Sequence, residues 1–93
     1  MSAQAKHIVV HGRVQGVGFR YFVYHTGSRL GLAGNVSNSP DGTVEIFVEG
    51  SPRRIAEFLR EVEKGPPMAR VERMDVHDVP AEGNYGSFSI EGW

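Results

Sequence analysis

Apolar and polar side chains alternate or recur at helical spacing along most of the chain, and this pattern predicts its elements. Residues 6–14 alternate in the way typical of a strand with one buried face. The buried face would carry Ile8, Val10 and Val14. A glycine-rich segment follows, and a helix is predicted after it, ending at Gly31. The apolar face of this helix would carry Phe22, Val23, Thr26 and Leu30.

A hairpin is predicted in the middle of the chain. Residues 33–39 form its first strand, and residues 43–49 form its second strand, whose valine and isoleucine side chains share one face. The sequence SPDG at residues 39–42 lies between them. This is a turn sequence because proline presets φ, aspartate can bond to its own backbone and glycine tolerates a positive φ.

The second helix has the clearest signals of all the predicted elements. Ser51 can cap its N-terminus, Pro52 suits the first helical position, and Gly65 and Pro66 end it. Its apolar positions are Ile55, Phe58, Leu59 and Val62.

Two further strands close the chain. Residues 71–79 are irregular because the apolar side chains change face between Val71 and Met74. In the last strand, Phe88 and Ile90 alternate cleanly with polar residues.

The order of these elements predicts the fold class. Its first six elements match the ferredoxin-like split βαβ sandwich, an α+β fold. We expect an antiparallel sheet of four to five strands with two helices on one face. The first two strands would run parallel on either side of the third, so their carboxyl ends meet at one edge of the sheet. Residues 6–93 are expected to form a single domain after a flexible N-terminus at residues 1–5.

Length and composition agree with one small globular domain. The chain has 93 residues, of which 40% are hydrophobic and 23% charged, so neither disorder nor a second domain is expected. The net charge of −1 conceals an asymmetry, because residues 1–40 contain four basic residues and no acid. These dispersed charges favour a small anionic ligand and are too few for a nucleic-acid-binding stripe.

Several classes of site are disfavoured. The chain has no cysteine, which excludes disulfides, a thiolate nucleophile and cysteine-ligated metals. His7 and His11 are about 13 Å apart along one strand, too far to share a metal ion, so we expect no metal and no cofactor. No apolar run suits a signal peptide or a membrane span, and we therefore expect a cytoplasmic protein with no membrane partner. The sequence leaves the oligomeric state open, with a monomer favoured.

One candidate site stands out between the first strand and the first helix. Gly16 and Gly18 allow backbone N–H groups to converge on one point, with the positive end of the helix dipole behind them. Arg20 adds a guanidinium that matches phosphate oxygens. Asn38 ends the second strand at the same edge of the sheet, so we expect Arg20 and Asn38 to converge beside the helix N-terminus.

Two segments carry a specific resemblance. Residues 14–20 read VQGVGFR and residues 34–45 read GNVSNSPDGTVE. In this order and at this separation they resemble the two signatures of the acylphosphatases, and the similarity covers nearly the whole chain. One departure is Asn35, which stands where many members of the family carry an aromatic residue.

The resemblance implies a fold, an activity and a site. It implies that Arg20 grips a phosphate, that Asn38 orients the attacking water, and that the loop before the helix binds the phosphate. The phosphate-binding residues would be Gln15, Gly16, Val17, Gly18, Phe19 and Arg20. The substrate would be a small acyl phosphate, and inorganic phosphate or sulfate would bind as product or inhibitor.

The residues themselves are consistent with this chemistry. Asn38 is a neutral amide and cannot act as a base, and no acid precedes Asp41 to protonate a leaving group. An acyl phosphate has a carboxylate leaving group that needs no protonation, and phosphoryl transfer needs mainly positioning and charge stabilisation. We therefore predict a metal-independent hydrolase of the carboxylic–phosphoric anhydride bond.

Two alternatives remain open at this stage. A non-catalytic module could bind a small anion without turnover. The second alternative is an RNA-binding module, because residues 18–24 are aromatic-rich and ferredoxin-like sheets serve in RNA recognition. That aromatic segment begins a helix, however, and Glu45 and Glu49 on the hairpin strand would repel a phosphate backbone, so no nucleic-acid partner is expected.

Overall fold

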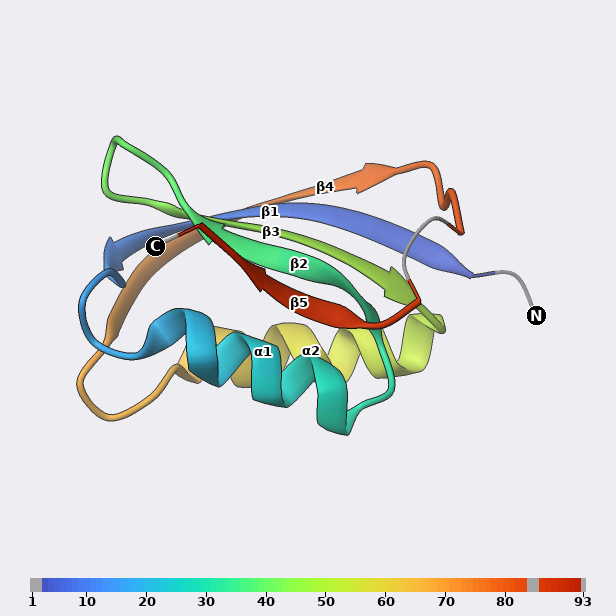
Figure 1. The fold of residues 1–93 in the computed structure, drawn as a ribbon, viewed down its shortest axis with the longest axis horizontal. Helices are drawn as coiled ribbons and strands as arrows, with labels where there is room; N and C mark the ends of the chain where they lie inside the picture. Colours follow the sequence, from blue (N-terminus) through green and yellow to red (C-terminus); the bar gives the residue numbers. More distant parts are fainter. Residues whose placement is uncertain (1–2, 84–85, 93) are drawn as a thin grey trace.

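Five strands form one sheet, and both helices cover the same face of it (Figure 1). The structure is a computed structural model that describes residues 3–83 and 86–92. In chain order the elements are β1 (Gln4–Arg13), α1 (Phe19–Arg29), β2 (Ala33–Asn38), β3 (Val44–Gly50), α2 (Pro52–Lys64), β4 (Arg70–Val79) and β5 (Phe88–Glu91). The strand order β4-β1-β3-β2-β5 confirms the ferredoxin-like α+β arrangement.

The fifth strand corrects one expectation about the sheet. We expected an antiparallel sheet, but β5 pairs with β2 in parallel, with Gly34 opposite Phe88 and Val36 opposite Ile90. β4 and β5 occupy opposite edges, so the chain crosses the whole sheet between them. Consequently β1, β2 and β5 all run in one direction, and their carboxyl ends arrive at the same end of the sheet.

The irregular pattern of β4 has a structural cause. The pairing between β1 and β4 shifts register at His11 and Gly12, so that Arg73 faces His11 while Val71 faces Gly12. The extra residue between them is a β-bulge. It returns Val71 to the helix-covered face, where both Val71 and Met74 pack against the core.

The strand β1 begins earlier than the alternation predicted. Gln4 and Ala5 pair with Gly50 and Glu49 of β3, and Ala5 is buried. Strand pairing therefore extends into residues 1–5, the segment expected to be a flexible N-terminus. Residues 1–2 lie outside the described residues.

The core lies between the sheet and the two helices. From α2 it takes the expected side chains of Ile55, Phe58 and Val62. Ser51 caps this helix as predicted, since its Oγ accepts a bond of 3.3 Å from the Arg54 N–H. The buried face of α1 differs from the predicted one by a rotation about the helix axis. Its buried residues are Phe19, Val23, Thr26 and Gly27, while Phe22 and Leu30 lie at the margin. No helix in the described part of the chain is long and apolar enough to cross a membrane.

Gly27 allows β5 to dock against α1. A Cβ atom at this position would lie 2.5 Å from Cδ2 of the Phe88 ring. Phe88 is itself buried and packs against Phe58 with ring centroids 5.8 Å apart. The glycine therefore serves close packing between helix and strand, although it weakens the helix by about 1 kcal/mol relative to alanine.

We expect Gly27→Ala to destabilise the protein by a net of up to about 2 kcal/mol. Overpacking a core typically costs about 1–3 kcal/mol, which outweighs the helical preference of alanine. Urea unfolding would measure the difference, with Ser28→Ala on the exposed side of the same helix as the control, expected to stay within about 0.5 kcal/mol of the parent. A more stable Gly27→Ala protein would contradict this account of how β5 is held.

Candidate active site

The loop between β1 and α1 has the backbone geometry of an anion cradle. Gly16 and Gly18 have φ angles of 74° and 76°, in the left-handed region that favours glycine. Gly18 is the N-cap of α1, and among the described residues no side chain caps this helix. The N–H groups of the first helical turn have no partner within the helix. They are therefore available to an anion, and the positive end of the helix dipole reinforces the attraction.

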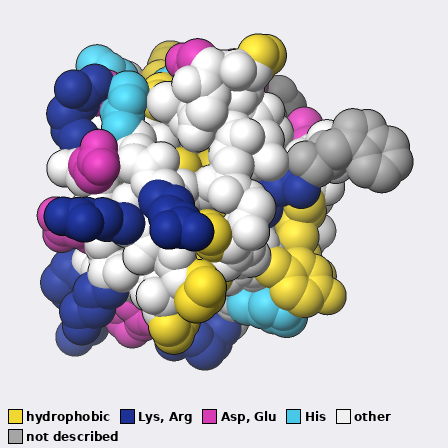
Figure 2. All heavy atoms as spheres, turned by 90° about the vertical axis from the view of Figure 1, so that its left-hand side faces the viewer, with side chains coloured by type: hydrophobic (Ala, Val, Ile, Leu, Met, Phe, Trp, Pro, Cys, Tyr) yellow, Lys and Arg dark blue, Asp and Glu magenta, His cyan; other side chains and the backbone are white. Residues whose placement is uncertain are grey.

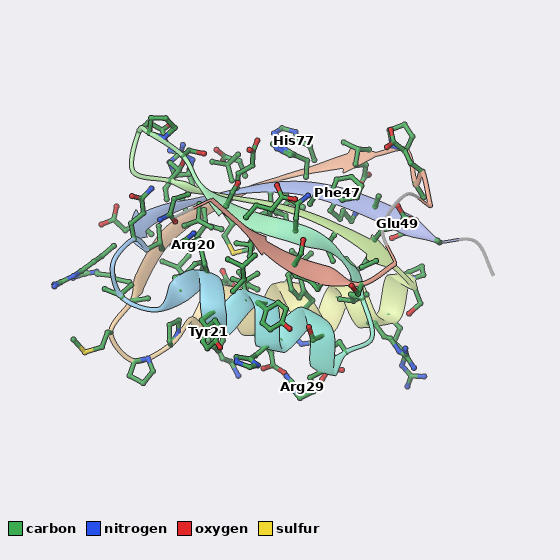
Figure 3. The ribbon with its side chains drawn as sticks, viewed as in Figure 1. Arg20, Tyr21, Arg29, Phe47, Glu49 and His77 are labelled. Atoms are coloured by element: carbon green, nitrogen blue, oxygen red, sulfur yellow. The ribbon has the colours of Figure 1, made fainter. Side chains whose placement is uncertain are left out.

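Arg20 is fixed by the end of β5. Its Nη1 donates a hydrogen bond of 3.2 Å to the carbonyl oxygen of Glu91. Figure 3 shows Arg20 between the start of α1 and the sheet. A guanidinium has five N–H donors, so one bond to a carbonyl leaves capacity to bind two oxygens of a phosphate.

Asn38 approaches the same place from the sheet. It is the last residue of β2 and pairs with Val44 on the face that the helices cover. Its side-chain Oδ1 is shielded from bulk solvent. The convergence expected from the topology is present, because Arg20 and Asn38 line one pocket.

The pocket has a volume of about 320 Å³. Its lining residues are Val14, Gly16, Gly18, Phe19, Arg20, Tyr21, Asn38, Ile90 and Gly92. Of the predicted phosphate-binding residues, Gln15 and Val17 are not among them. Phe19 is 1% exposed, and its side chain belongs to the core. We therefore expect any contact of Phe19 with a ligand to come from its backbone.

The side chain of Gln15 ties two loops together. Its Nε2 donates bonds of 2.8 Å to the carbonyl oxygens of both Ser39 and Thr43. Those residues also bond to each other, since the Ser39 N–H donates to the Thr43 carbonyl at 2.9 Å. The side chain of Gln15 thus holds the residue that directly follows Asn38, so it is placed to position the end of β2 beside the pocket.

Asp41 stabilises the same turn. Its Oδ1 accepts bonds from the Thr43 hydroxyl at 2.6 Å and from the Thr43 N–H at 3.0 Å. These bonds, the hydroxyl first, hold the pKa of the Asp41 carboxyl below its usual value. The carboxylate therefore stays ionised, and continues to accept both bonds, at more acidic pH than an ordinary aspartate would.

Among the described residues that line the pocket, Arg20 is the one with a charged side chain. Figure 2 shows this end of the molecule, where Lys and Arg side chains lie around an area of backbone and uncharged polar atoms. Within the described residues, no three His, Cys, Asp or Glu side chains gather closely enough to hold a metal ion.

Sequence reasoning missed the contribution of residues 90–92 to the site, and that of Tyr21. Ile90 and Gly92 line the pocket, and the Glu91 carbonyl binds Arg20. The alternation around Ile90 predicts a strand but does not specify which edge of the sheet it joins. Tyr21 also lines the pocket, and its position next to Arg20 in the sequence was the available signal.

We expect Gln15→Ala to lower kcat roughly tenfold, equivalent to about 1.4 kcal/mol in the barrier, because the turn beside Asn38 loses two bonds. The free energy of unfolding should fall by about 1–2 kcal/mol, since each carbonyl keeps one other partner. Steady-state kinetics with an acyl phosphate and urea unfolding would measure both effects.

Gln4, the other glutamine of the chain, gives a matched control for this substitution. It is exposed at the start of β1, so Gln4→Ala should leave both quantities nearly unchanged. Gln15→Glu keeps the shape but removes the donor, and should behave like Gln15→Ala. An unchanged kcat in both Gln15 variants would exclude the positioning role.

Comparison with known proteins gives a consistent result. A family model described as Acylphosphatase matches residues 6–90. An acylphosphatase from Koribacter versatilis is 45% identical over 89 residues, which cover 96% of this chain and 81% of that protein. The crystal structure of acylphosphatase from Bacillus subtilis matches with a TM-score of 0.92 and 39% identity over 96% of this chain and 99% of that one. Full-length HypF in its phosphate- and nucleotide-bound form matches with a TM-score of 0.86 and 35% identity, covering 98% of this chain and 12% of that one.

Proposed function

Because the chain belongs to the acylphosphatase family, we propose that it hydrolyses acyl phosphates to a carboxylate and inorganic phosphate in the pocket between α1 and the sheet. The observation that carries this proposal is that Arg20, Asn38 and the glycines of the loop line one hollow. Inorganic phosphate, the product, would bind there as an inhibitor, and the enzyme would act as a monomer.

In this proposal the phosphoryl group binds first to the loop. The N–H groups around Gly16 and Gly18 and at the start of α1 donate to its oxygens, and Arg20 binds two oxygens through its planar donors. The Glu91 carbonyl fixes the direction of the guanidinium before substrate arrives. Donors held in place in this way stabilise the charge on the phosphoryl oxygens as the bond to the leaving group breaks.

Asn38 would position the attacking water. Its amide can accept a hydrogen bond from water and donate one to a phosphoryl oxygen, but it cannot take up the proton. The water's proton goes to an oxygen of the phosphate itself, either in the loose transition state or after the phosphoryl group has been transferred to the water oxygen. The P–O bond to the acyl oxygen breaks as the bond to the water oxygen forms, and the acyl group leaves as a carboxylate.

The same reasoning sets the substrate class. A carboxylate is a stable leaving group that requires neither a proton nor a metal ion. The alkoxide of an ordinary phosphate monoester requires one or the other, and the pocket lining that the structure describes offers no acidic side chain to supply a proton or bind a metal ion. The site is therefore suited to carboxylic–phosphoric anhydrides.

The open face of the sheet disfavours the RNA-binding alternative. Phe47 lies on this face of β3, but Glu45 and Glu49 lie on the same face of the same strand. The Glu45 carboxylate contacts Nε2 of His7 at 2.7 Å, which places an acid beside the histidine of the next strand. Such a face would repel the phosphates of a nucleic acid.

We expect the wild-type protein to release phosphate from acetyl phosphate at the same rate with and without a chelator, and to hydrolyse an alkyl phosphate at least a thousandfold more slowly. A colorimetric phosphate assay measures all three rates. Equal rates on alkyl and acyl phosphates would refute the argument from the leaving group. Loss of activity in the chelator would refute metal independence.

We expect Arg20→Ala and Asn38→Ala each to lower kcat/KM by a factor of 100 or more, corresponding to about 3 kcal/mol of lost transition-state stabilisation. The two variants should differ in how this loss is divided between kcat and KM. Arg20→Ala should raise KM and lower kcat because the guanidinium binds phosphate before and during reaction, whereas Asn38→Ala should lower mainly kcat.

Matched controls lie on the same elements. Arg13→Ala removes a cation at the exposed end of β1, and Asn35→Ala removes an amide from the opposite face of β2. Both should retain activity within a factor of about three in variants that remain folded. A folded Asn38→Ala enzyme with unaltered turnover would remove Asn38 from the mechanism.

A further inference from the structure

Two histidines face each other across the strands β1 and β4. Sequence alone relates His7 to His11, four residues further along β1, but the strand register places His77 of β4 directly opposite His7. Residues that are opposite in an antiparallel pair share a face of the sheet and have Cβ atoms about 4.5–5.5 Å apart. Figure 3 shows His77 on the side of the sheet away from the helices. The two imidazoles therefore lie together on the open face of the sheet.

A carboxylate fixes the state of the His7 ring. Nε2 of His7 lies 2.7 Å from Oε2 of Glu45 on β3. An ionised carboxylate can only accept a hydrogen bond, so in the neutral imidazole the hydrogen lies on Nε2 and the lone pair on Nδ1. Histidines that bind a metal ion almost always donate their other ring N–H to such an acceptor, which fixes the tautomer and makes the ligating nitrogen more basic. His7 thus has the hydrogen-bond partner that is typical of a metal ligand.

The ring of His77 is exposed and available to a ligand. Among the described residues, none forms a hydrogen bond or an ion pair with it. Two imidazole nitrogens that bind one ion each lie about 2.0–2.1 Å from it, so they are at most about 4 Å apart. The Cβ separation of an opposite pair is compatible with this distance.

The charge of the surrounding face also favours a cation. Glu45 and Glu49 lie on this face of β3, and Asp75 lies on it in β4. Arg73 is on the same face, but its guanidinium is paired with Asp75 at 3.1 Å. Acids are therefore in excess among these four side chains, and such an excess raises the local concentration of cations.

We propose that His7 and His77 bind one divalent transition-metal ion, with water completing its coordination and Glu45 accepting the hydrogen bond from His7. Imidazole suits Cu²⁺, Ni²⁺ and Zn²⁺, and among these ions Cu²⁺ binds a given site most tightly. The described residues bring no third His, Cys, Asp or Glu ligand into the site, so the ion remains exchangeable. It joins β4, an edge strand with a single partner, to β1.

The test is a titration with Cu²⁺ alone, in a buffer that does not chelate metals, followed by electron paramagnetic resonance. The wild type should bind one ion, with coupling to two imidazole nitrogens. His77→Ala should lose one of these couplings and bind Cu²⁺ roughly tenfold more weakly, or weaker still. His25→Ala removes an exposed histidine from α1 and should leave both the coupling and the affinity unchanged.

The role of the carboxylate is tested separately. Glu45→Gln should weaken Cu²⁺ binding about tenfold, because hydrogen-bond partners of ligating histidines typically contribute roughly 10–100-fold to affinity. Glu49→Gln removes the same charge from the same face, but the Glu49 carboxylate bonds to the N–H groups of Glu82 and Gly83 rather than to a histidine. It should weaken binding less than about threefold. Equal losses in the two variants would overturn the role of Glu45.

Stability gives a second measurement of the site. An ion that joins β1 to β4 stabilises the folded state by mass action, so Zn²⁺ should raise the urea midpoint of the wild type but not that of His77→Ala. Cu²⁺ binding that is unchanged in His77→Ala, or that falls equally in His25→Ala, would overturn the site. Either result would leave the proposed hydrolysis standing, because the two histidines lie on the open face and the pocket lies on the side of the helices.

Discussion

The site depends on holding a guanidinium where the helix alone would not favour it. Arg20 is the second residue of α1, close to the positive end of the helix dipole, and no residue of the first turn, all of which the structure describes, is acidic. A cation at this end of a helix is unfavourable. The carbonyl of Glu91 offsets part of this cost by accepting a bond from Nη1. A bound phosphate would offset the rest, so the same electrostatic conflict favours binding of an anion here.

The fold meets this requirement by bringing three parallel strands to one end of the sheet. β1 leads into the loop, β2 ends at Asn38, and β5 ends beside Arg20. The edge strand β5 is short, and its position comes from packing against α1 through Phe88 rather than from a second strand partner. Packing at Gly27 therefore affects the direction of Arg20, although the two residues lie two helical turns apart.

Local signals explain which parts of this arrangement could be predicted from the sequence. Ser51, Pro52 and Gly65 mark the ends of α2 directly, and the convergence of Arg20 with Asn38 follows from the order and handedness of the connections. The edge that β5 joins does not follow from its sequence, because a short alternating strand suits either edge. The bonds of Gln15 to the hairpin turn were equally hidden, since they join a side chain to backbone atoms more than twenty residues away.

The composition of the cradle also reflects a conflict between stability and function. An acidic residue in the first turn of α1 would stabilise the helix by about 0.3–1 kcal/mol, and a side-chain cap in place of Gly18 would satisfy one of the N–H groups. Either change would place a negative or polar group in the proposed phosphate site. The left-handed φ of Gly18 also opposes any residue with a Cβ. The N-terminus of α1 is therefore left uncapped by the side chains that the structure describes, and burial of Phe19 and Val23 in the core stabilises the helix instead.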